Sequence, residues 1–109
     1  MSIWNAFITE QAELDLRNIH EYIAYTLLAP EAAKSTTKKL MDSIDRIEQA
    51  RKSCPLLRKE PWRSRGLRRK NTGNFVIFYI ASIETSIVTI IRVMYSGRNV
   101  EEVLDGTRK

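Results

Sequence analysis

Cysteine and histidine are nearly absent from this sequence, with Cys54 and His20 as the single example of each. A lone cysteine excludes an internal disulfide and predicts a reducing, cytoplasmic location. No apolar run approaches the roughly 20 residues that a membrane span needs, and residues 1–5 lack the features of a signal peptide. Histidine, cysteine and carboxylate side chains never occur at metal-ligand spacing. We therefore expect no metal, no cofactor and no membrane partner.

The chain contains enough hydrophobic residues for one folded domain. Its 109 residues predict a single domain over 1–109, and a hydrophobic share of 43% provides the core. Lysine and arginine number 18 against 13 aspartates and glutamates, which gives a net charge of +5. This balance fits a nucleic-acid partner, an acidic protein partner, or a basic surface with no specific partner.

One stretch of the chain is strongly basic. Between positions 58 and 70 only Glu60 opposes the basic residues Arg58, Lys59, Arg63, Arg65, Arg68, Arg69 and Lys70. Residues 56–65 read as a loop with Pro61 and Trp62 at its centre. Aromatic and basic residues together suit single-stranded RNA, so Trp62 either stacks on a base or holds the loop through apolar contacts.

Two helices are predicted ahead of the basic stretch. Residues 4–8 alternate as a short strand, and Thr9 is suited to cap the helix that follows. That helix runs from residue 10 to about residue 29, because Pro30 disfavours helical geometry before it. Its apolar stripe comprises Ala12, Leu16, Ile19 and Ile23, with Glu13, Asp15, Arg17 and Glu21 largely off it. Pro30 begins a second helix to about residue 52, with the stripe Ala33, Leu40, Ile44 and Ile47.

Three strands are predicted in the second half of the chain, at 66–71, 74–81 and 87–95. In the first of them Leu67 and Arg69 share one face, and Arg68 and Lys70 share the other. A short helical end is expected at 100–104, followed by frayed residues. This order predicts an α+β fold in which a helical hairpin covers one face of a small, mostly antiparallel sheet. The opposite face, if partly open, would be a concave platform.

The last strand contains the main conflict in the pattern. Arg92 and Tyr95 interrupt an apolar run, and a buried arginine is costly unless it has a partner or a function. Two roles fit Arg92: a structural one, paired with backbone carbonyls or a carboxylate such as Glu101 or Glu102, or a functional one. Arg98, after Gly97, either binds phosphate or is a solvated arginine at the strand end.

Several of these features together resemble one protein family. They are the order β-α-α-β-β-β, the helix pattern Ala12-x3-Leu16-x2-Ile19-x2-Tyr22-Ile23-Ala24, the hairpin strand 74–79, and the ending Arg92-Val93-x-Tyr95-x-Gly97-Arg98-Asn99. The pattern is similar to the RelE/ParE superfamily, the toxins of bacterial type II toxin–antitoxin modules, and covers about residues 3–104. The resemblance implies a cognate antitoxin whose acidic, amphipathic C-terminal segment folds along the toxin. It also implies one of two mechanisms, and fold alone does not choose between them.

RelE-like members cut mRNA in the ribosomal A site, so the resemblance implies the ribosome and mRNA as partners. Such cleavage needs a base, cations for the phosphate and an acid for the leaving oxygen. By resemblance the catalytic candidates are Arg69, Lys70, Arg92 and Tyr95. The nucleic-acid-binding candidates are Arg58, Lys59, Trp62, Arg63, Arg65, Arg68 and Arg98. His20 lies on the first helix, far in sequence from the predicted platform, and Tyr79 has the pattern of a core residue.

ParE-like members instead inhibit DNA gyrase by binding, without nuclease activity. The long helical arms and the missing C-terminal histidine favour this alternative. The concentration of basic residues beside the sheet favours RelE-like mRNA cleavage, which is the function that the sequence predicts first. An endoribonuclease and a gyrase inhibitor therefore both stay open, with the role of Arg92 as the deciding point.

Overall fold

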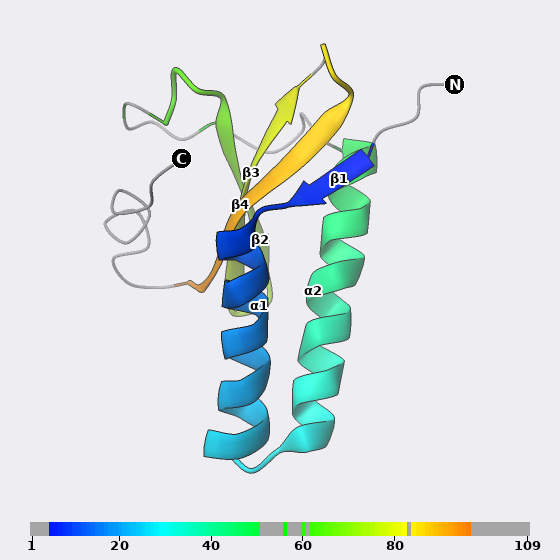
Figure 1. Cartoon of the computed structure of the whole chain (residues 1–109), viewed down its shortest axis with the longest axis vertical. Helices are drawn as coiled ribbons and strands as arrows, with labels where there is room; N and C mark the ends of the chain where they lie inside the picture. Colours follow the sequence, from blue (N-terminus) through cyan, green and yellow to red (C-terminus); the bar gives the residue numbers. More distant parts are fainter. Residues whose placement is uncertain (1–4, 51–55, 57–59, 61, 83, 97–109) are drawn as a thin grey trace.

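The computed structural model describes residues 5–50, 56, 60, 62–82 and 84–96. Its elements are β1 (Asn5–Ile8), α1 (Glu10–Glu21), the π-helix η1 (Tyr22–Thr26), α2 (Pro30–Ala50), β2 (Leu67–Thr72), β3 (Phe75–Ser82) and β4 (Ile87–Tyr95). The two helices form an antiparallel hairpin against the sheet, and the tip of the hairpin projects beyond it (Figure 1). The predicted α+β fold is confirmed.

The four strands form one mixed sheet in the order β1–β4–β3–β2. β3 pairs antiparallel with β2 and β4, whereas β1 runs parallel to β4, with Asn5 opposite Ile87 and Ile8 opposite Ile90. The register of β3 and β4 shifts after Phe78, so that β4 carries a bulge before Arg92. The strand predicted at 87–95 has those bounds, and the two before it are displaced by one residue.

Thr9 begins α1 as its sequence position predicts. Its Oγ1 accepts the Ala12 N–H at 3.1 Å and donates to the Ile90 carbonyl at 2.9 Å, so the cap also ties the helix to β4. The prediction that Asp15 lies off the buried stripe is wrong, since this residue is only 7% exposed. Asp15 follows Ala12 by three positions and precedes Ile19 by four, which places it on the stripe itself.

The hairpin tip differs from the long first helix that the sequence predicts. The α-helical pattern ends at Glu21 and continues as η1, where the Leu27 N–H bonds the Tyr22 carbonyl at 3.0 Å. Leu28 then adopts a positive φ of 55°, a left-handed conformation that normally favours glycine and ends helices. The carbonyl of Ala29 accepts the Ala33 N–H at 3.0 Å, and α2 begins at Pro30.

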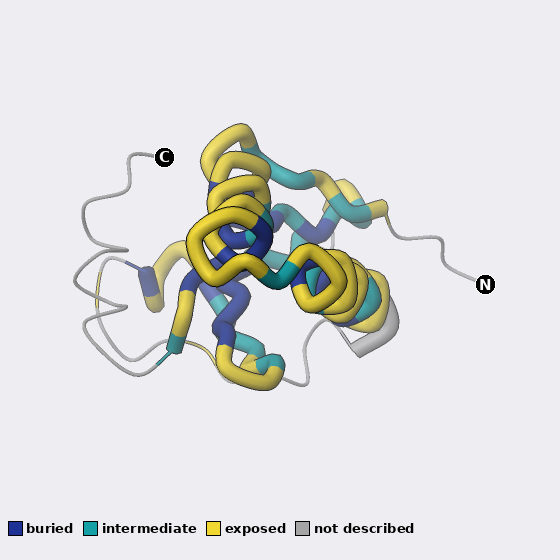
Figure 2. The backbone as a smooth tube through the Cα atoms, turned by 90° about the horizontal axis from the view of Figure 1, so that it is seen from below, coloured by how far each residue is buried: buried dark blue, intermediate teal, exposed yellow. Residues whose placement is uncertain are grey.

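The main core lies between the helical hairpin and the sheet. α1 contributes Ala12 and Ile19, and η1 contributes Ile23. The predicted stripe of the second helix is fully buried, comprising Ala33, Leu40, Ile44 and Ile47. Exposed positions line the outer surfaces of both helices (Figure 2). Burial of one helical stripe against the apolar sheet face is the principal force that holds the two layers together.

The sheet face away from the helices carries a second apolar cluster. It comprises Trp62, Leu67, Val76, Phe78, Ile91 and Met94, with Ile80 packed against it. Phe78 and Val76 have no exposed surface, and Trp62 is 3% exposed. This corrects the expectation of an open concave platform, because the centre of that face is filled. β3 and β4 carry apolar side chains on both faces, because the sheet has a core on each side.

Candidate functional site

The centre of the candidate site is an ion pair between α1 and β4. Arg92 Nε donates to Asp15 Oδ2 at 2.7 Å, and Arg92 Nη2 donates to Asp15 Oδ1 at 2.8 Å. The two side chains are 15% and 8% exposed. Two parallel hydrogen bonds fix the guanidinium plane against the carboxylate, the strongest geometry for this type of pair. The guanidinium of Arg92 therefore faces α1.

Asp15 also completes the edge of the sheet. β1 ends at Ile8, opposite Ile90, and α1 continues beside the rest of β4. There the Val93 N–H donates to Asp15 Oδ2 at 3.0 Å, while Gln11 Nε2 donates to Oδ1 at 3.2 Å. The carboxylate thus satisfies a buried backbone donor that β1 is too short to reach. Residues 101 and 102, the carboxylates proposed as partners of Arg92, lie outside the described residues.

A groove of about 250 Å³ runs between α1 and the end of β4. It is lined by Asp15, Asn18, Ile19, Tyr22, Arg92, Val93, Met94 and Tyr95. The rings of Tyr22 and Tyr95 meet edge to face with centroids 6.5 Å apart, and Tyr95 lies 4.6 Å from Phe75. An apolar wall with an aromatic rim and a single ion pair suits an apolar segment of a protein better than a phosphate.

Tyr95 is the candidate catalytic residue that is most accessible, with 45% of its surface exposed. Partial burial and the neighbouring Tyr22 raise the pKa of Tyr95 above its ordinary value. The phenol is protonated at neutral pH, so it can donate a hydrogen bond to a ligand. It borders the same groove as Arg92.

The other two catalytic candidates lie across the sheet from Arg92. Arg69 on β2 is opposite Phe78 on β3, which in turn is opposite Arg92 on β4. Two strand spacings separate the backbones of Arg69 and Arg92, about 10 Å. Arg69 Nε donates to Asn71 Oδ1 at 3.3 Å, and Lys70 lies on the opposite face of β2. The four candidates thus divide between the two sides of β3.

Residues 62–66, the end of the basic loop, form a turn that begins at Trp62. The Leu67 N–H bonds the Trp62 carbonyl at 3.0 Å, and the Gly66 N–H bonds the Arg63 carbonyl at 3.1 Å. Gly66 has a φ of 81°, a conformation that glycine adopts readily and that residues with a side chain rarely adopt. Trp62 is buried in the second cluster, the position of a hydrophobic latch, and Arg65 stacks over its ring at 5.2 Å. Arg63 and Arg65 are exposed.

The remaining nucleic-acid candidates are only partly described. Arg68 is half-buried on β2 and forms an isolated bridge with Leu56. Arg58, Lys59 and Arg98 lie outside the described residues, as do Cys54 and the helical end expected at 100–104. The loop residues and β2 share one edge of the sheet, whereas the groove beside Tyr95 lies along α1.

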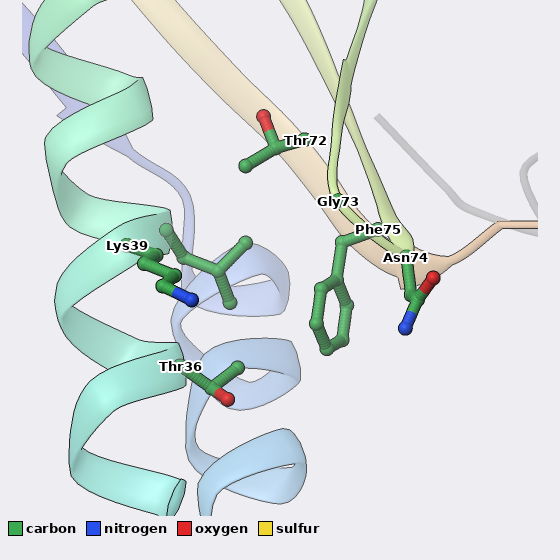
Figure 3. Close-up of a pocket in the computed structure, with 7 residues that line it drawn as sticks. Thr36, Lys39, Thr72, Gly73, Asn74 and Phe75 are labelled. Carbon is green, nitrogen blue, oxygen red and sulfur yellow. The ribbon is translucent and has the colours of Figure 1, made fainter.

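A second pocket of about 190 Å³ opens between α2 and the β2–β3 turn (Figure 3). Phe75 and Leu40 form its apolar walls, and Lys39 and Thr36 on α2 face Asn74 across it. Thr72 borders the pocket, and its Oγ1 is buried without a hydrogen-bond partner. Since Phe75 also stacks on Tyr95, this pocket and the α1–β4 groove share one aromatic wall.

Two further residues, His20 and Tyr79, support the fold. His20 Nδ1 shares a hydrogen bond with Thr37 Oγ1 at 3.0 Å, which joins α1 to α2, and Tyr79 is fully buried. Within the part of the chain that the structure describes, no three histidine, cysteine or carboxylate side chains gather as metal ligands would. None of the described helices is both long and apolar enough to cross a membrane.

The sequence prediction missed two contributors to the site, Asp15 and Tyr22. Asp15 had a signal, because an acid at a buried helix position and an arginine in a buried strand each need a partner. Tyr22 follows Asp15 by seven positions and Ile19 by three, so helical spacing places it on the same side as these residues, but that spacing does not show that Tyr95 is its neighbour.

Comparison with known proteins finds a family match and matches among solved structures. The family described as ParE toxin of the type II toxin–antitoxin system parDE matches residues 6–100. A chain from the chromosomal ParDE toxin–antitoxin system of P. aeruginosa is similar in structure, with a TM-score of 0.70 and 18% identity over 86% of this chain and 97% of the other. Among proteins of curated function, none matches this chain.

Two RelE-type structures are also similar. The RelBE2 toxin–antitoxin complex of Mycobacterium tuberculosis matches with a TM-score of 0.58 and 18% identity, over 87% of this chain and 100% of the other. The isolated E. coli RelE toxin matches with a TM-score of 0.54 and 14% identity, over 95% and 96%. At these identities the structural matches establish a shared fold.

Proposed function

The chain belongs to the family of ParE toxins of type II toxin–antitoxin systems, and from this premise we propose that it arrests growth by binding and inhibiting DNA gyrase. The observation that carries the proposal is the pairing of Arg92 with Asp15. In the RelE-like mechanism this arginine would stabilise a phosphate. Here its guanidinium is bound to a buried carboxylate, and separating a buried pair costs about 3–5 kcal/mol.

The second apolar cluster supports the same proposal. RNA cleavage on the sheet would need an accessible face on which cations and an acid converge. In this chain Phe78 and Ile91 are buried at the centre of that face, under Trp62. Arg69 and Tyr95 lie on strands at opposite sides of β3. The geometry therefore favours a toxin that acts by binding a protein.

The surface of the hairpin tip has the chemistry of a protein-binding site. Large apolar side chains are exposed at Tyr22, Tyr25, Leu27 and Leu28, the last at 81%. Exposed apolar patches mark interaction sites, and tyrosine is enriched among the residues that contribute most binding energy. We assign this tip to the contact with gyrase.

The cognate antitoxin is the second proposed partner. An acidic, amphipathic segment matches the pocket of Figure 3, where Lys39 borders the apolar surfaces of Leu40 and Phe75. If the antitoxin binds there, Lys39→Glu weakens the complex in a titration, whereas Lys34→Glu, an equal change at an exposed position of α2, leaves the affinity unchanged. Equal affinities for both variants would contradict this placement.

The deciding experiment is a supercoiling assay with purified gyrase and relaxed plasmid. We expect the protein to block supercoiling and to stabilise cleaved DNA, and Tyr25→Ala to weaken both effects. Leu14→Ala is the matched control, since Leu14 is also an exposed apolar residue but lies in the middle of α1. If gyrase keeps its full supercoiling activity at a toxin concentration that arrests growth, the proposal is wrong.

RelE-like cleavage is the second candidate, and the position of the cations on β2 favours it. Arg69 and Lys70 are partly exposed on the edge strand β2. Tyr95 is exposed on β4, on the other side of β3. If the protein is such a nuclease, primer extension on translating ribosomes shows cuts in A-site mRNA. Arg69→Ala and Lys70→Ala then reduce these cuts, and intact mRNA with the wild-type protein removes this candidate.

A further inference from the structure

The net charge of this protein is concentrated in one short segment. Residues 58–70 contain seven basic residues and one acid, a net charge of +6, so the rest of the chain together carries −1 against the total of +5. A basic surface of this kind is an electrostatic footprint of polyanion binding. The remainder of the molecule contributes almost nothing to that attraction.

The structure places the described part of this segment along one border of the molecule. Arg63 and Arg65 lie on the turn 62–66, and Arg69 and Lys70 follow on opposite faces of β2, the edge strand opposite β1. We name these four residues the cationic edge. In Figure 1 the turn lies at the end of the long axis away from the hairpin tip. The two surfaces can therefore be occupied at the same time.

Contacts within the turn position the side chain of Arg65. Trp62 anchors it in the second cluster, and Arg65 stacks over the indole ring at 5.2 Å. Glu60 Oε1 accepts the Ser64 N–H at 3.1 Å, and the hydrogen bonds from Ser64 lower the pKa of this carboxyl. The one acid of the segment thus accepts a hydrogen bond within the turn, and ordering Arg65 in advance reduces the entropic cost of binding.

We infer that the cationic edge binds the sugar–phosphate backbone of double-stranded DNA. The inference rests on the proposed function, because gyrase presents a DNA duplex to any protein bound on it. Binding to phosphates needs arranged positive charge and no base contact. Proteins that bind single strands add exposed aromatic rings for base stacking. Within residues 62–72 the one aromatic side chain is Trp62, and it is 3% exposed. The edge therefore has the chemistry of a duplex-backbone contact.

The test measures binding of the purified chain to a short labelled DNA duplex by fluorescence anisotropy, with salt varied from about 50 to 200 mM. We expect Arg63→Ala/Arg65→Ala to bind about 10- to 100-fold more weakly and to lower the slope of log K against log salt by about 2. Arg17→Ala/Arg46→Ala is the matched control, because it removes two exposed arginines from the helices instead. This control should bind as the wild type does.

Four results would overturn the inference. The first three are no duplex binding by the wild-type chain at the lowest salt, an equal loss of affinity in both double variants, and tighter binding of single-stranded RNA than of duplex DNA. Displacement of the duplex by polyglutamate at equal charge concentration would assign the edge to an acidic peptide and overturn it too. The supercoiling assay is a separate measurement. A wild-type protein that does not inhibit gyrase would contradict the proposed function, whereas one that does not bind duplex DNA would contradict this inference.

Discussion

Asp15 and Arg92 lie 77 residues apart in the sequence and are joined by hydrogen bonds of 2.7 and 2.8 Å. The same carboxylate accepts the Val93 N–H. One side chain on α1 therefore satisfies a buried cation and a buried edge of the sheet together. Both functional candidates depend on this contact, because it decides whether Arg92 is available to a ligand.

We predict that Asp15→Asn destabilises the protein by about 3–5 kcal/mol, because it leaves the Arg92 cation buried without a counter-charge. Urea unfolding followed by circular dichroism measures the change. Asp42→Asn is the control, since Asp42 pairs with Lys38 at 3.8 Å on an exposed helix surface, where a pair contributes about 0–1 kcal/mol. Equal stability losses in the two variants would contradict the structural role of Asp15.

Trp62→Ala should lower the free energy of unfolding by about 3–5 kcal/mol, since it empties the largest position of the second cluster. Tyr25→Ala, which removes an exposed ring, should change it by less than about 0.5 kcal/mol. Thermal unfolding of the two variants compares these losses. A wild-type melting temperature for Trp62→Ala would show that the sheet face does not depend on this side chain.

Leu28→Gly should stabilise the fold by about 1 kcal/mol, because glycine adopts a positive φ without the clash of a side chain. The same change removes the most exposed leucine of the tip, so gyrase inhibition should fall while the melting temperature rises. Chemical denaturation and the supercoiling assay on one preparation test both directions. Parallel gains in stability and inhibition would show that the tip does not contact gyrase.

The raised pKa of Tyr95 predicts a loss of stability at alkaline pH. The folded state holds the phenol proton to a higher pH than the unfolded chain does. The stabilisation is therefore complete below the ordinary pKa of tyrosine and is lost as pH rises through the raised value. Urea unfolding across that interval should show a smaller pH slope for Tyr95→Phe. An unchanged slope would mean that another group causes the loss.

Much of this fold was predictable from local patterns. Thr9, the stripe of α2 and the bounds of β4 followed from capping preference and periodicity, which depend on residues close in the sequence. The second cluster was not predicted as a core, although β3 and β4 carry apolar residues on both faces. For Trp62, which covers it, the sequence left base stacking and an apolar latch both open, because the path of that loop depends on the sheet already being formed.

The site was less predictable than the fold for a related reason. Asp15 had the spacing of a buried residue, but its chemical type suggested a surface position. Its partner lies at the other end of the chain, and a strand pattern alone does not show which arginine turns toward a helix. The bulge in β4 before Arg92 is a local departure from regular strand geometry, so periodicity could not place Arg92.

The parallel pairing of β1 with β4 has a consequence for synthesis on the ribosome. Thr9, at the end of β1, donates to the carbonyl of Ile90, 81 residues later in the chain. The first strand therefore stays unpaired in the sheet until β4 has emerged from the ribosome, and closing so long a loop is slow. A chain interrupted before β4 has neither completed core nor ion pair. The folded toxin therefore forms only after β4 has been synthesised.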